Sequence, residues 1–479
     1  MSKNLKDHRQ LGKELDLYSF HDVAPGAIFW HDKGYKIYRT LIDFLRKSLL
    51  NEGYDEISTP VMVKKDLFIE SGHWDFYSEN LFNVITYTTE EKNKTKELIE
   101  KHIVEELNKE YEETREKNPK AILQTFTREI LLDNKVVVHV IIHLQRISKD
   151  ESAASYTYVI EFLPDYSLKP MNCPESTLIY SSTNRSYQDL PIRLAEFGLL
   201  NRNELSGVLG GLFRVRQFMI DDAHHYVRPN QILKEIHELL VYTVDLYKKF
   251  GFETSFYLAT KPDRAMGDPK LWKEAEKDLE QALKDSKVKY SVKEKDGAFY
   301  GPKIDIHIKD SQDRDWQLAT IQLDFQIPEK MKLEYTDSDG KAKRPVMVHR
   351  AVLGSIERFI GILVEHYQGA FPLWLSPVQV VIISVSDKHN KLAEKVYKKL
   401  LENDVRVELN LENKTVGNKI REATLQKIPY MVIIGDKEKQ KSNDKNLFGS
   451  VRTREGKDEG LTNINEFISK LKAQIETFS

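Results

Sequence analysis

Arginine, glutamate and aromatic side chains gather in one stretch of the sequence, at Arg202, Glu204, Arg214 and Phe218. The guanidinium fork fits phosphate oxygens, and a nearby aromatic ring can stack on a base. A nucleotide site is therefore one interpretation of this cluster. Arginine and glutamate pairs are also common on protein surfaces, so the residue types alone do not separate the two interpretations.

Candidate metal ligands occur at three separate places: Cys173, His224 beside Asp222, and His349. They are 51 and then 125 residues apart, so no local zinc-finger spacing links them. Adjacent residues of a strand point to opposite faces, so at most one of His224 and His225 can face a shared site. The spacing leaves a common metal site open without predicting it.

His139 and His143 offer a competing metal pair, because ligands on a helix recur at this spacing. The β-branched residues around them favour a strand instead, in which both could share one face. No glutamate or cysteine accompanies them, which favours a structural role.

Composition limits the class of protein. The chain has 479 residues, 40% of them hydrophobic, which is enough for one large domain and one or two smaller ones. No run of 18 apolar residues occurs, and residues 1–9 are polar. Cys173 is the single cysteine, which excludes an internal disulfide framework. We predict a soluble, cytoplasmic protein without a membrane partner.

Charge is unevenly distributed. The net charge of −2 divides into +4 for residues 376–479, with 19 Lys+Arg against 15 Asp+Glu, and −6 for residues 1–375. The whole chain is therefore not a basic nucleic-acid binder, whereas the mildly basic tail is compatible with a polyanionic partner.

The elements that must position these residues fall into three regions. Helical periodicity over residues 35–53 ends at Gly53, and an extended segment at 54–62 enters Pro60. Residues 90–117 predict a solvated amphipathic helix with a stripe of Leu98, Ile103, Leu107 and Tyr111. Two β-rich runs follow, 136–142 and 156–162, with a turn predicted at Asp133-Asn134. This region is predicted to be an inserted α+β subdomain at 83–160.

Strands and helices alternate beyond the linker at 371–377. Predicted strands at 378–385, 405–409 and 430–434 alternate with predicted helices at 391–403 and 418–427. Alternation at this length is typical of a compact α/β domain with a largely parallel sheet.

The clusters together resemble the catalytic core of threonyl-tRNA synthetases. The matching motifs cover nearly the whole chain except the insertion, and they are Asp7-His8-Arg9, Leu15 to Tyr18, Ala24-Pro25-Gly26, Ser71 to Asp75, Lys169 to Pro174, Arg202-Asn203-Glu204, Asp221 to His224, Gly297 to Ile304, Ile321 to Phe325, Gly354 to Arg358, Arg421-Glu422 and Pro429-Tyr430. The resemblance implies an α+β catalytic domain on an antiparallel sheet, the class II synthetase fold, followed by a small α/β anticodon-binding domain. The implied boundaries are 1–25 for an N-terminal linker segment, 26–370 for the catalytic domain, and 376–479 for the anticodon-binding domain.

The resemblance also implies the amino-acid site. The family's three zinc ligands fall on Cys173, His224 and His349, with one Zn²⁺ per chain and an open position that threonine's amino and hydroxyl groups complete. Asp222 would accept the hydrogen bond of the threonine hydroxyl. The other substrate-binding positions that the resemblance implies are Met171, Tyr300 and Gln322.

For ATP, the resemblance places Arg202 between the substrate carboxylate and the α-phosphate, and Arg358 on the nucleotide phosphates from the other side. Glu204 and Phe218 would read and stack adenine, and Arg214 would hold the γ-phosphate. Gln317, Thr320 and Ser355 would line the pocket, and Mg²⁺ would accompany ATP.

For the tRNA, His73 matches a residue implicated in transfer to the terminal ribose. Positions that match anticodon contacts to threonine tRNA are Asn413, Arg421, Glu438 and Arg452. Lys427 stands where arginine is frequent, which keeps the charge but loses bidentate geometry. Ile220, Asn201 and the pair Glu175-Ser176 also depart from the family pattern beside the site, and none of them removes a ligand.

Two alternatives remain. A prolyl or glycyl synthetase would share the fold without this zinc set, and a non-enzymatic paralogue could bind tRNA with a decayed site. A homodimer is expected through the segment Tyr54 to Met62. Family members commonly carry an amino-terminal editing domain, so the start of this chain predicts no cis editing of Ser-tRNA and a separate trans-editing protein. A trimmed piece of a longer enzyme is the alternative.

Overall fold

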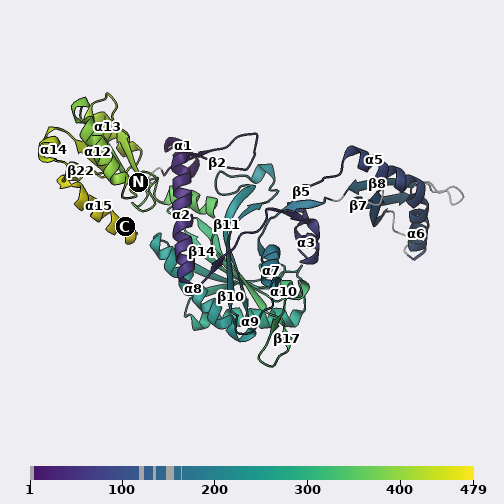
Figure 1. The fold of residues 1–479 in the computed structure, drawn as a ribbon. Coiled ribbons are helices and arrows are strands. Elements are labelled where there is room, and N and C mark those ends of the chain that lie inside the picture. Colours follow the sequence, from purple (N-terminus) through teal and green to yellow (C-terminus); the bar gives the residue numbers. More distant parts are fainter. Residues whose placement is uncertain (1–4, 118–122, 133–135, 147–155, 163, 479) are drawn as a thin grey trace. The chain divides into compact units, whose positions relative to one another are not determined.

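The computed structural model describes residues 5–117, 123–132, 136–146, 156–162 and 164–478. Its chain forms two compact units, which are described separately (Figure 1). The larger unit joins residues 1–59 to residues 171–479, and the smaller unit comprises Pro60–Pro170.

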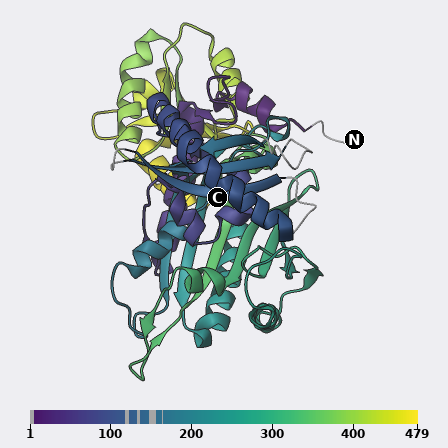
Figure 2. The same cartoon turned by 90° about the vertical axis from the view of Figure 1, so that its right-hand side faces the viewer.

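An eight-stranded sheet dominates the larger unit. Its strand order is β13-β12-β14-β15-β18-β11-β10-β3, and Figure 2 shows its strands edge to edge in teal and green. All neighbours are antiparallel except the parallel pairs β12/β13 and β10/β3. The strands are β3 (Asp55–Glu56), β10 (Ile192–Asn201), β11 (Gln217–Val227), β12 (Thr254–Ala259), β13 (Tyr290–Lys293), β14 (Lys303–Lys309), β15 (Asp315–Asp324) and β18 (Val346–Ser355).

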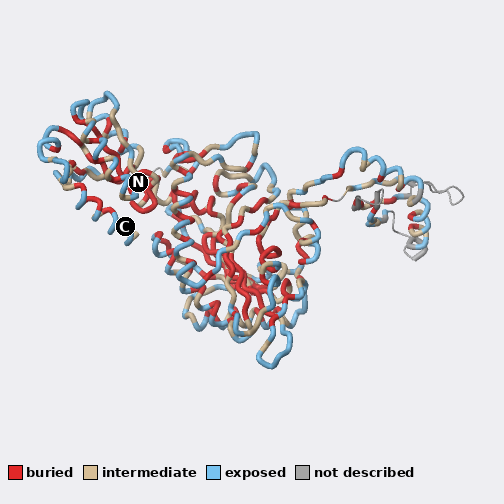
Figure 3. The backbone as a smooth tube through the Cα atoms, viewed as in Figure 1, coloured by how far each residue is buried: buried red, intermediate tan, exposed pale blue. Residues whose placement is uncertain are grey.

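Helices bury their apolar stripes against this sheet. Helix α2 (Asp32–Asn51) buries Ile37, Leu41 and Leu45, which recur every fourth residue, and Gly53 follows with a φ of +75°. Buried residues therefore concentrate around the sheet (Figure 3). The other helices of this region are α1 (His8–Glu14), α7 (Cys173–Ser181), η3 (Ser206–Val208), η4 (Pro229–Gln231), α8 (Ile232–Lys249), α9 (Pro269–Asp285), α10 (Gln326–Lys330) and α11 (Ile356–His366). Two small sheets pair β1 (Tyr18–Ser19) with β2 (Phe29–Trp30) and β16 (Tyr335–Thr336) with β17 (Ala342–Lys343).

The predicted α/β alternation at the carboxyl end is confirmed. Five strands lie in the order β20-β19-β21-β22-β23, and the first three are parallel. Arg406 donates hydrogen bonds to the carbonyls of Ser376 (2.8 Å) and Trp374 (2.6 Å), which fixes the preceding linker to this sheet. The elements are β19 (Val380–Ser384), η5 (Asp387–His389), α12 (Asn390–Leu401), β20 (Val407–Asn410), α13 (Val416–Leu425), β21 (Tyr430–Ile434), α14 (Asp436–Lys441), β22 (Phe448–Thr453), β23 (Asp458–Asn463) and α15 (Ile464–Glu476).

The smaller unit has its own hydrophobic core. Leu107 and Tyr111 of the predicted amphipathic helix pack with Val138, Val140 and Ile142 of the central strand. The predicted helix and both predicted strands are present, whereas the turn predicted at Asp133-Asn134 lies outside the described residues. The elements are β4 (Met62–Lys64), α3 (Lys65–Glu70), α4 (Trp74–Tyr77), η1 (Ser78–Asn80), β5 (Phe82–Val84), α5 (Thr89–Leu98), the π-helical turn η2 (Ile99–Ile103), α6 (Val104–Lys117), β6 (Leu123–Leu132), β7 (Val136–Arg146), β8 (Tyr156–Phe162) and β9 (Tyr166–Leu168).

Candidate active site and metal centre

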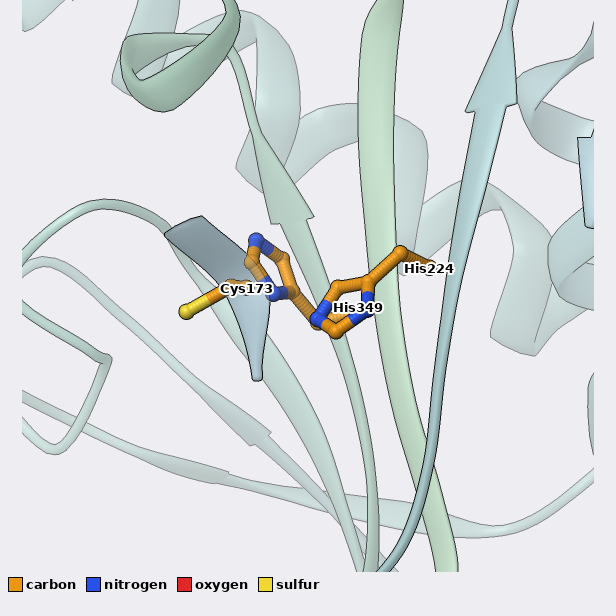
Figure 4. A group of neighbouring side chains, drawn as sticks. All are labelled: Cys173, His224 and His349. Atoms are coloured by element: carbon orange, nitrogen blue, oxygen red, sulfur yellow. The ribbon is translucent and has the colours of Figure 1, made fainter. Parts of the chain in front are cut away.

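Three residues that are distant in sequence meet at the middle of the eight-stranded sheet. His224 on β11 and His349 on β18 are direct cross-strand partners, and Cys173 begins helix α7. One ligand atom from each lies within 4.8 Å of the others, and all three residues are buried (Figure 4). Strand register therefore brings together ligands that their sequence spacing could not connect.

Carboxylates surround this cysteine and histidine cluster. Asp324 Oδ2 lies 2.9 Å from His349 Nε2, and Asp222 Oδ2 lies 3.9 Å from His224 Nε2. Burial raises the pKa of the Cys173 thiol, and the charges of Asp222, Glu175 and Asp324 raise it further. A cation is what would hold a thiolate in such surroundings, and a carboxylate on the second nitrogen of a ligating histidine is the usual outer partner. The donor set fits Zn²⁺.

The adjacent histidine belongs to the other face of the strand, as predicted. His225 Nδ1 lies 2.9 Å from Glu235 Oε2, and His225 Nε2 lies 2.9 Å from the Tyr54 hydroxyl. Burial lowers the pKa of His225, against the opposing influence of Glu235. His225 is therefore a satisfied core histidine.

Asp222 borders the metal cluster on the same face as His224. Asn172 Nδ2 donates to Asp222 Oδ2 at 3.2 Å. Burial raises the pKa of Asp222 to about 6, although His349 and Asn172 favour its charged form. The side chain of Asn172 occupies the space where a Cβ on Gly198 would stand, 2.1 Å from Asn172 Oδ1. That glycine thus lets Asn172 approach the sheet and contact Asp222.

The predicted substrate residues also lie around the cluster. Met171 and Tyr300 pack in the same apolar group as Cys173, and the Tyr300 ring lies 4.9 Å from the His349 ring. Gln322 is the cross-strand partner of His349, accepts the Tyr300 hydroxyl, and donates to Thr320 Oγ1 at 3.1 Å. Gln317 lies further along β15 as the partner of His307, and it is exposed.

Three arginines form a second cluster, on the hairpin between β10 and β11 and on α11. Arg202 lies over the Phe218 ring, 5.1 Å from the ring centre, which is a cation–π contact. Burial lowers the pKa of Arg358, and the guanidinium groups of Arg202 and Arg214 lower it further. This concentration of positive charge fits a polyphosphate. Arg214 Nη2 meets Glu204 Oε2 at 2.7 Å, so these two residues are paired with each other.

Buried carboxylates hold the backbone at this second cluster. Asp221 accepts N–H groups from Val352 (3.1 Å), Leu353 (2.9 Å) and Gly354 (2.9 Å), just before helix α11. Ser355 caps that helix by accepting the Arg358 N–H at 3.3 Å, and it donates to Glu357 Oε2 at 3.0 Å. The strand end and the helix start that carry Ser355 and Arg358 are thereby fixed.

The remaining predicted residues belong to the smaller unit and to the carboxyl-terminal region. His73 is buried in the smaller unit, with Nδ1 2.9 Å from Ser71 Oγ. His143 lies on strand β7, 3.1 Å from Thr125 Oγ1 and 3.6 Å from Glu161 Oε2, in agreement with the structural interpretation. The side chain of His139 lies outside the described residues.

The four predicted anticodon residues belong to the carboxyl-terminal α/β region. Asn413 precedes helix α13, Arg421 lies on it, and Arg452 lies on β22. Asn413 and Arg421 are exposed. Glu438 is buried, and its carboxylate accepts the Gly435 N–H at 2.8 Å and the Ser450 hydroxyl at 2.5 Å.

Sequence reasoning assigned no role to four residues that the structure places beside the site. Asn172 and Asp324 contact Asp222 and His349, Asp221 holds the start of α11, and His8 contacts the β10–β11 hairpin. All four stand inside the motifs that carried the family resemblance. Each of the four is a polar residue within a matched motif, and this was the signal in the sequence that could have pointed to them. The group that each residue contacts is known only from the fold.

Comparison with known proteins agrees with this geometry. The family model for the tRNA synthetase class II core domain (G, H, P, S and T) matches residues 156–367, and that for an anticodon binding domain matches residues 379–474. The fold is therefore a class II synthetase core built on a mostly antiparallel sheet, followed by an α/β anticodon-binding domain, as predicted.

Relatives narrow the class to one family. A threonine–tRNA ligase of Caldanaerobacter subterraneus subsp. tengcongensis is 44% identical over 472 residues, 98% of this chain and 61% of that relative's length. The solved RNA binding domain of threonyl-tRNA synthetase from Cryptosporidium parvum Iowa II is 34% identical, with a TM-score of 0.79 and 98% of each chain covered. The chain belongs to the threonyl-tRNA synthetase family, within class II.

A more distant structure shows the shared fold alone. Prolyl-tRNA synthetase from Cryptosporidium parvum is 14% identical, with a TM-score of 0.61, and the match covers 98% of this chain and 75% of that one.

Among the described residues, no helix is both long and apolar enough to cross a bilayer.

Proposed function

We propose that this chain is a threonine–tRNA ligase that activates threonine with ATP and transfers it to the 3′ end of threonine tRNA. One observation carries the proposal: Cys173, His224 and His349 lie within 4.8 Å of one another beside Asp222, on the sheet that also presents the arginine cluster. An amino-acid site and a nucleotide site on one sheet are what aminoacyl-adenylate formation requires.

The metal cluster would recognise the amino acid. Zn²⁺ held by Cys173, His224 and His349 would offer an open coordination position to the amino and hydroxyl groups of threonine. Asp222 would accept the hydroxyl's hydrogen bond, with its carboxylate oriented by the 3.2 Å contact from Asn172. Valine lacks that hydroxyl and would leave Asp222 unsatisfied, and sites of this kind reject such analogues by about 10⁴-fold or more.

The arginines would meet the charge that develops during activation. The threonine carboxylate attacks the α-phosphate of ATP, forming the mixed anhydride and releasing pyrophosphate, for which Mg²⁺ normally accompanies the nucleotide. Arg202 would bridge the carboxylate and the α-phosphate, and Arg358 and Arg214 would hold the other phosphates. Adenine would stack on the Phe218 ring, and the Arg202 guanidinium, which lies 5.1 Å from the centre of that ring, would leave it to meet the α-phosphate.

The tRNA contacts remain predictions that support the same activity. His73 would assist transfer to the terminal ribose, and Asn413, Arg421 and Arg452 would contact the anticodon. Glu438 would orient the Gly435 backbone and Ser450, which its carboxylate already contacts.

We also expect a homodimer, because β3 is an edge strand of the sheet and its residues Asp55 and Glu56 are exposed. Sedimentation as a 55.8 kDa monomer at micromolar concentration would contradict the dimer.

Fidelity toward serine is the finer part of the proposal. Serine keeps the amino and hydroxyl groups and lacks one methyl, a difference worth only about 10- to 200-fold in a pocket. We expect the purified chain to form Ser-tRNA and not to hydrolyse it, so that clearance needs a separate trans-editing protein. Preformed Ser-tRNA added to the chain tests this, because deacylation well above the spontaneous rate would reveal an editing activity.

The deciding experiment is ATP–pyrophosphate exchange with the zinc-loaded chain. Threonine should support exchange, valine should be rejected, and serine should be a weak substrate. Exchange with proline or glycine instead would indicate another synthetase of the class. No exchange with any amino acid, by protein that binds one zinc per chain, would favour a tRNA-binding paralogue without ligase activity.

A further inference from the structure

The N-terminal segment packs against the hairpin that carries the predicted nucleotide residues, here called the nucleotide hairpin (residues 202–216). Leu11 and Leu15, on and directly after helix α1, belong to the same hydrophobic core as Leu212 of the hairpin. The Gly26 carbonyl accepts the Arg216 N–H at 2.7 Å at the hairpin's returning end. A segment expected to be a linker therefore supports a loop on which Arg202, Glu204 and Arg214 lie.

His8 makes the most specific of these contacts. It is 3% exposed, its Nδ1 lies 2.7 Å from Glu365 Oε1, and its Nε2 lies 3.1 Å from the Leu212 N–H. Burial would raise the pKa of Glu365, but hydrogen bonds from His8 and Arg314 outweigh it and keep that pKa below its usual value. Glu365 is then an acceptor, so Nδ1 of His8 carries the proton. The Nε2 lone pair is left to accept the backbone N–H of Leu212.

The tip of the hairpin is shaped for this contact. Gly211 has a φ of +57°, and a Cβ at that position would stand 2.2 Å from His8 Nε2. A glycine is thus required both by the backbone conformation and by the approach of the imidazole. The His8 ring also lies 4.0 Å from the ring of Phe213.

The same tip is held from the helix that follows the sheet. Arg358 Nε donates to the Phe213 carbonyl at 2.8 Å, and Arg314, which pairs with Glu365, lies over the Phe213 ring at 5.3 Å. Leu212 and Phe213 immediately precede Arg214. Histidine, glutamate and arginine therefore fix one dipeptide, which sets the direction in which the Arg214 side chain leaves the hairpin.

We propose that His8 is a positioning residue for ATP: its neutral imidazole ties Glu365 of α11 to the tip of the nucleotide hairpin and so orients Arg214 and Arg358 toward the nucleotide phosphates. The inference rests on the proposed function for the identity of the nucleotide. The contacts of His8 are with Glu365 and the tip of the hairpin, so its loss should weaken ATP binding and spare the threonine side.

Substitutions at His8 can separate hydrogen bonding from packing. His8→Phe keeps a ring against Phe213 and cannot accept the Leu212 N–H, whereas His8→Gln keeps an acceptor and loses the ring. His31→Ala is the matched control, because His31, just before helix α2, is also a histidine paired with a carboxylate, Asp16 at 2.6 Å.

The test measures ATP affinity of the full chain directly, by equilibrium dialysis, together with KM values in threonine-dependent exchange. We expect His8→Ala and His8→Phe to weaken ATP binding and raise KM for ATP about tenfold, as for one lost hydrogen bond to a placed loop, with KM for threonine within about twofold. His8→Gln should recover part of the loss, and His31→Ala should match wild type.

Wild-type ATP affinity in His8→Phe, or equal changes in KM for ATP and KM for threonine, would overturn the positioning role and show that His8 acts through packing. Equilibrium dialysis measures ATP binding without the exchange reaction, so it distinguishes failure of this inference from failure of the proposed function. Wild-type protein that binds ATP but exchanges nothing would refute the ligase, and unchanged ATP affinity in all His8 variants would refute the inference on its own.

Discussion

The zinc corner (Cys173, His224, His349 and Asp222) and the nucleotide corner (Arg202, Arg214, Phe218 and Arg358) share one sheet but are held in different ways. At the zinc corner, side chains on paired strands converge directly, as in the cross-strand pair His224 and His349. At the nucleotide corner, the three arginines lie on a hairpin and a helix start, and other side chains fix the backbone beneath them.

Acidic residues show the contrast most clearly. At the zinc corner Asp222 and Asp324 lie beside the candidate ligands. At the nucleotide corner Asp221, Glu357 and Glu365 accept backbone N–H groups from Leu353, Met219 and His8. At the zinc corner, loss of one ligand should abolish metal binding and threonine activation. At the nucleotide corner, loss of one backbone anchor should weaken ATP binding only in part.

Removing a ligand tests the zinc corner and should have the largest effect. Cys173→Ala and His224→Ala leave two protein ligands, so zinc should fall from one per chain to a small fraction, and threonine activation should drop at least about 1,000-fold. Metal analysis of the purified variants and pyrophosphate exchange measure the two losses. His225→Gln is the control, because this equally buried neighbour faces Glu235 and should keep its zinc. One full equivalent of zinc in both alanine variants would refute the ligand assignment.

Replacing the adjacent residues Asp221 and Asp222 one at a time tests whether the two corners act independently. Asp222→Asn should raise KM for threonine about 30-fold and reduce discrimination against valine, because an amide presents a donor to the hydroxyl. Asp221→Asn should raise KM for ATP by a similar factor, because one oxygen that accepts N–H groups from Val352, Leu353 or Gly354 is replaced. Steady-state exchange kinetics for both substrates decide the matter. If both variants affected the same substrate, the two corners would not be independent.

The same contrast explains what could be predicted from the sequence. Strand alternation predicted that at most one of His224 and His225 can face a shared site, and the structure places His225 against Glu235 and Tyr54 instead. The meeting of Cys173 with the two histidines did not follow from spacing, because β18 pairs with β11 across more than a hundred intervening residues. Only the family resemblance supplied that pairing in advance.

The anchors of the nucleotide corner were harder to foresee. The side chains of Asp221 and His8 accept backbone N–H groups. Every residue except proline has such an N–H group, so these contacts cannot be predicted from a pattern of residue types. Periodicity did predict the helix at 35–53, which buries a regular apolar face. Runs rich in β-branched residues predicted the strands of residues 136–142 and 156–162, and the α/β alternation followed from the order of such runs and helical patterns.

Altering the carboxyl-terminal region should leave both corners intact. Arg421→Ala removes an exposed guanidinium on α13, and Arg452→Ala removes a partly buried guanidinium on β22. Each should raise KM for threonine tRNA about tenfold, as for the loss of one base or phosphate contact, with pyrophosphate exchange within about twofold. Aminoacylation and exchange are compared on the same preparations. A parallel loss in exchange would show that this region also controls the active site.

The smallest expected effect concerns a carboxylate of the nucleotide corner and the pH dependence of stability. Burial raises the pKa of Glu357 from its ordinary value of 4.5 to about 7, although N–H groups of its own backbone and Met219 and the hydroxyl of Ser355 favour the charged form. Because the folded pKa is the higher one, folding favours the protonated group. Its contribution is complete below pH 4.5 and is lost as the pH rises through about 7. Between pH 6 and pH 8 the wild-type chain should lose about 1 kcal/mol of folding free energy through this residue, and Glu357→Gln, which still accepts from Met219 and can donate to Ser355, should not. Urea unfolding at the two pH values measures the difference, with exposed Glu253→Gln as the control that should follow wild type. Parallel pH profiles for wild type and Glu357→Gln would show that the Glu357 carboxyl does not change its charge between pH 6 and pH 8, against this prediction.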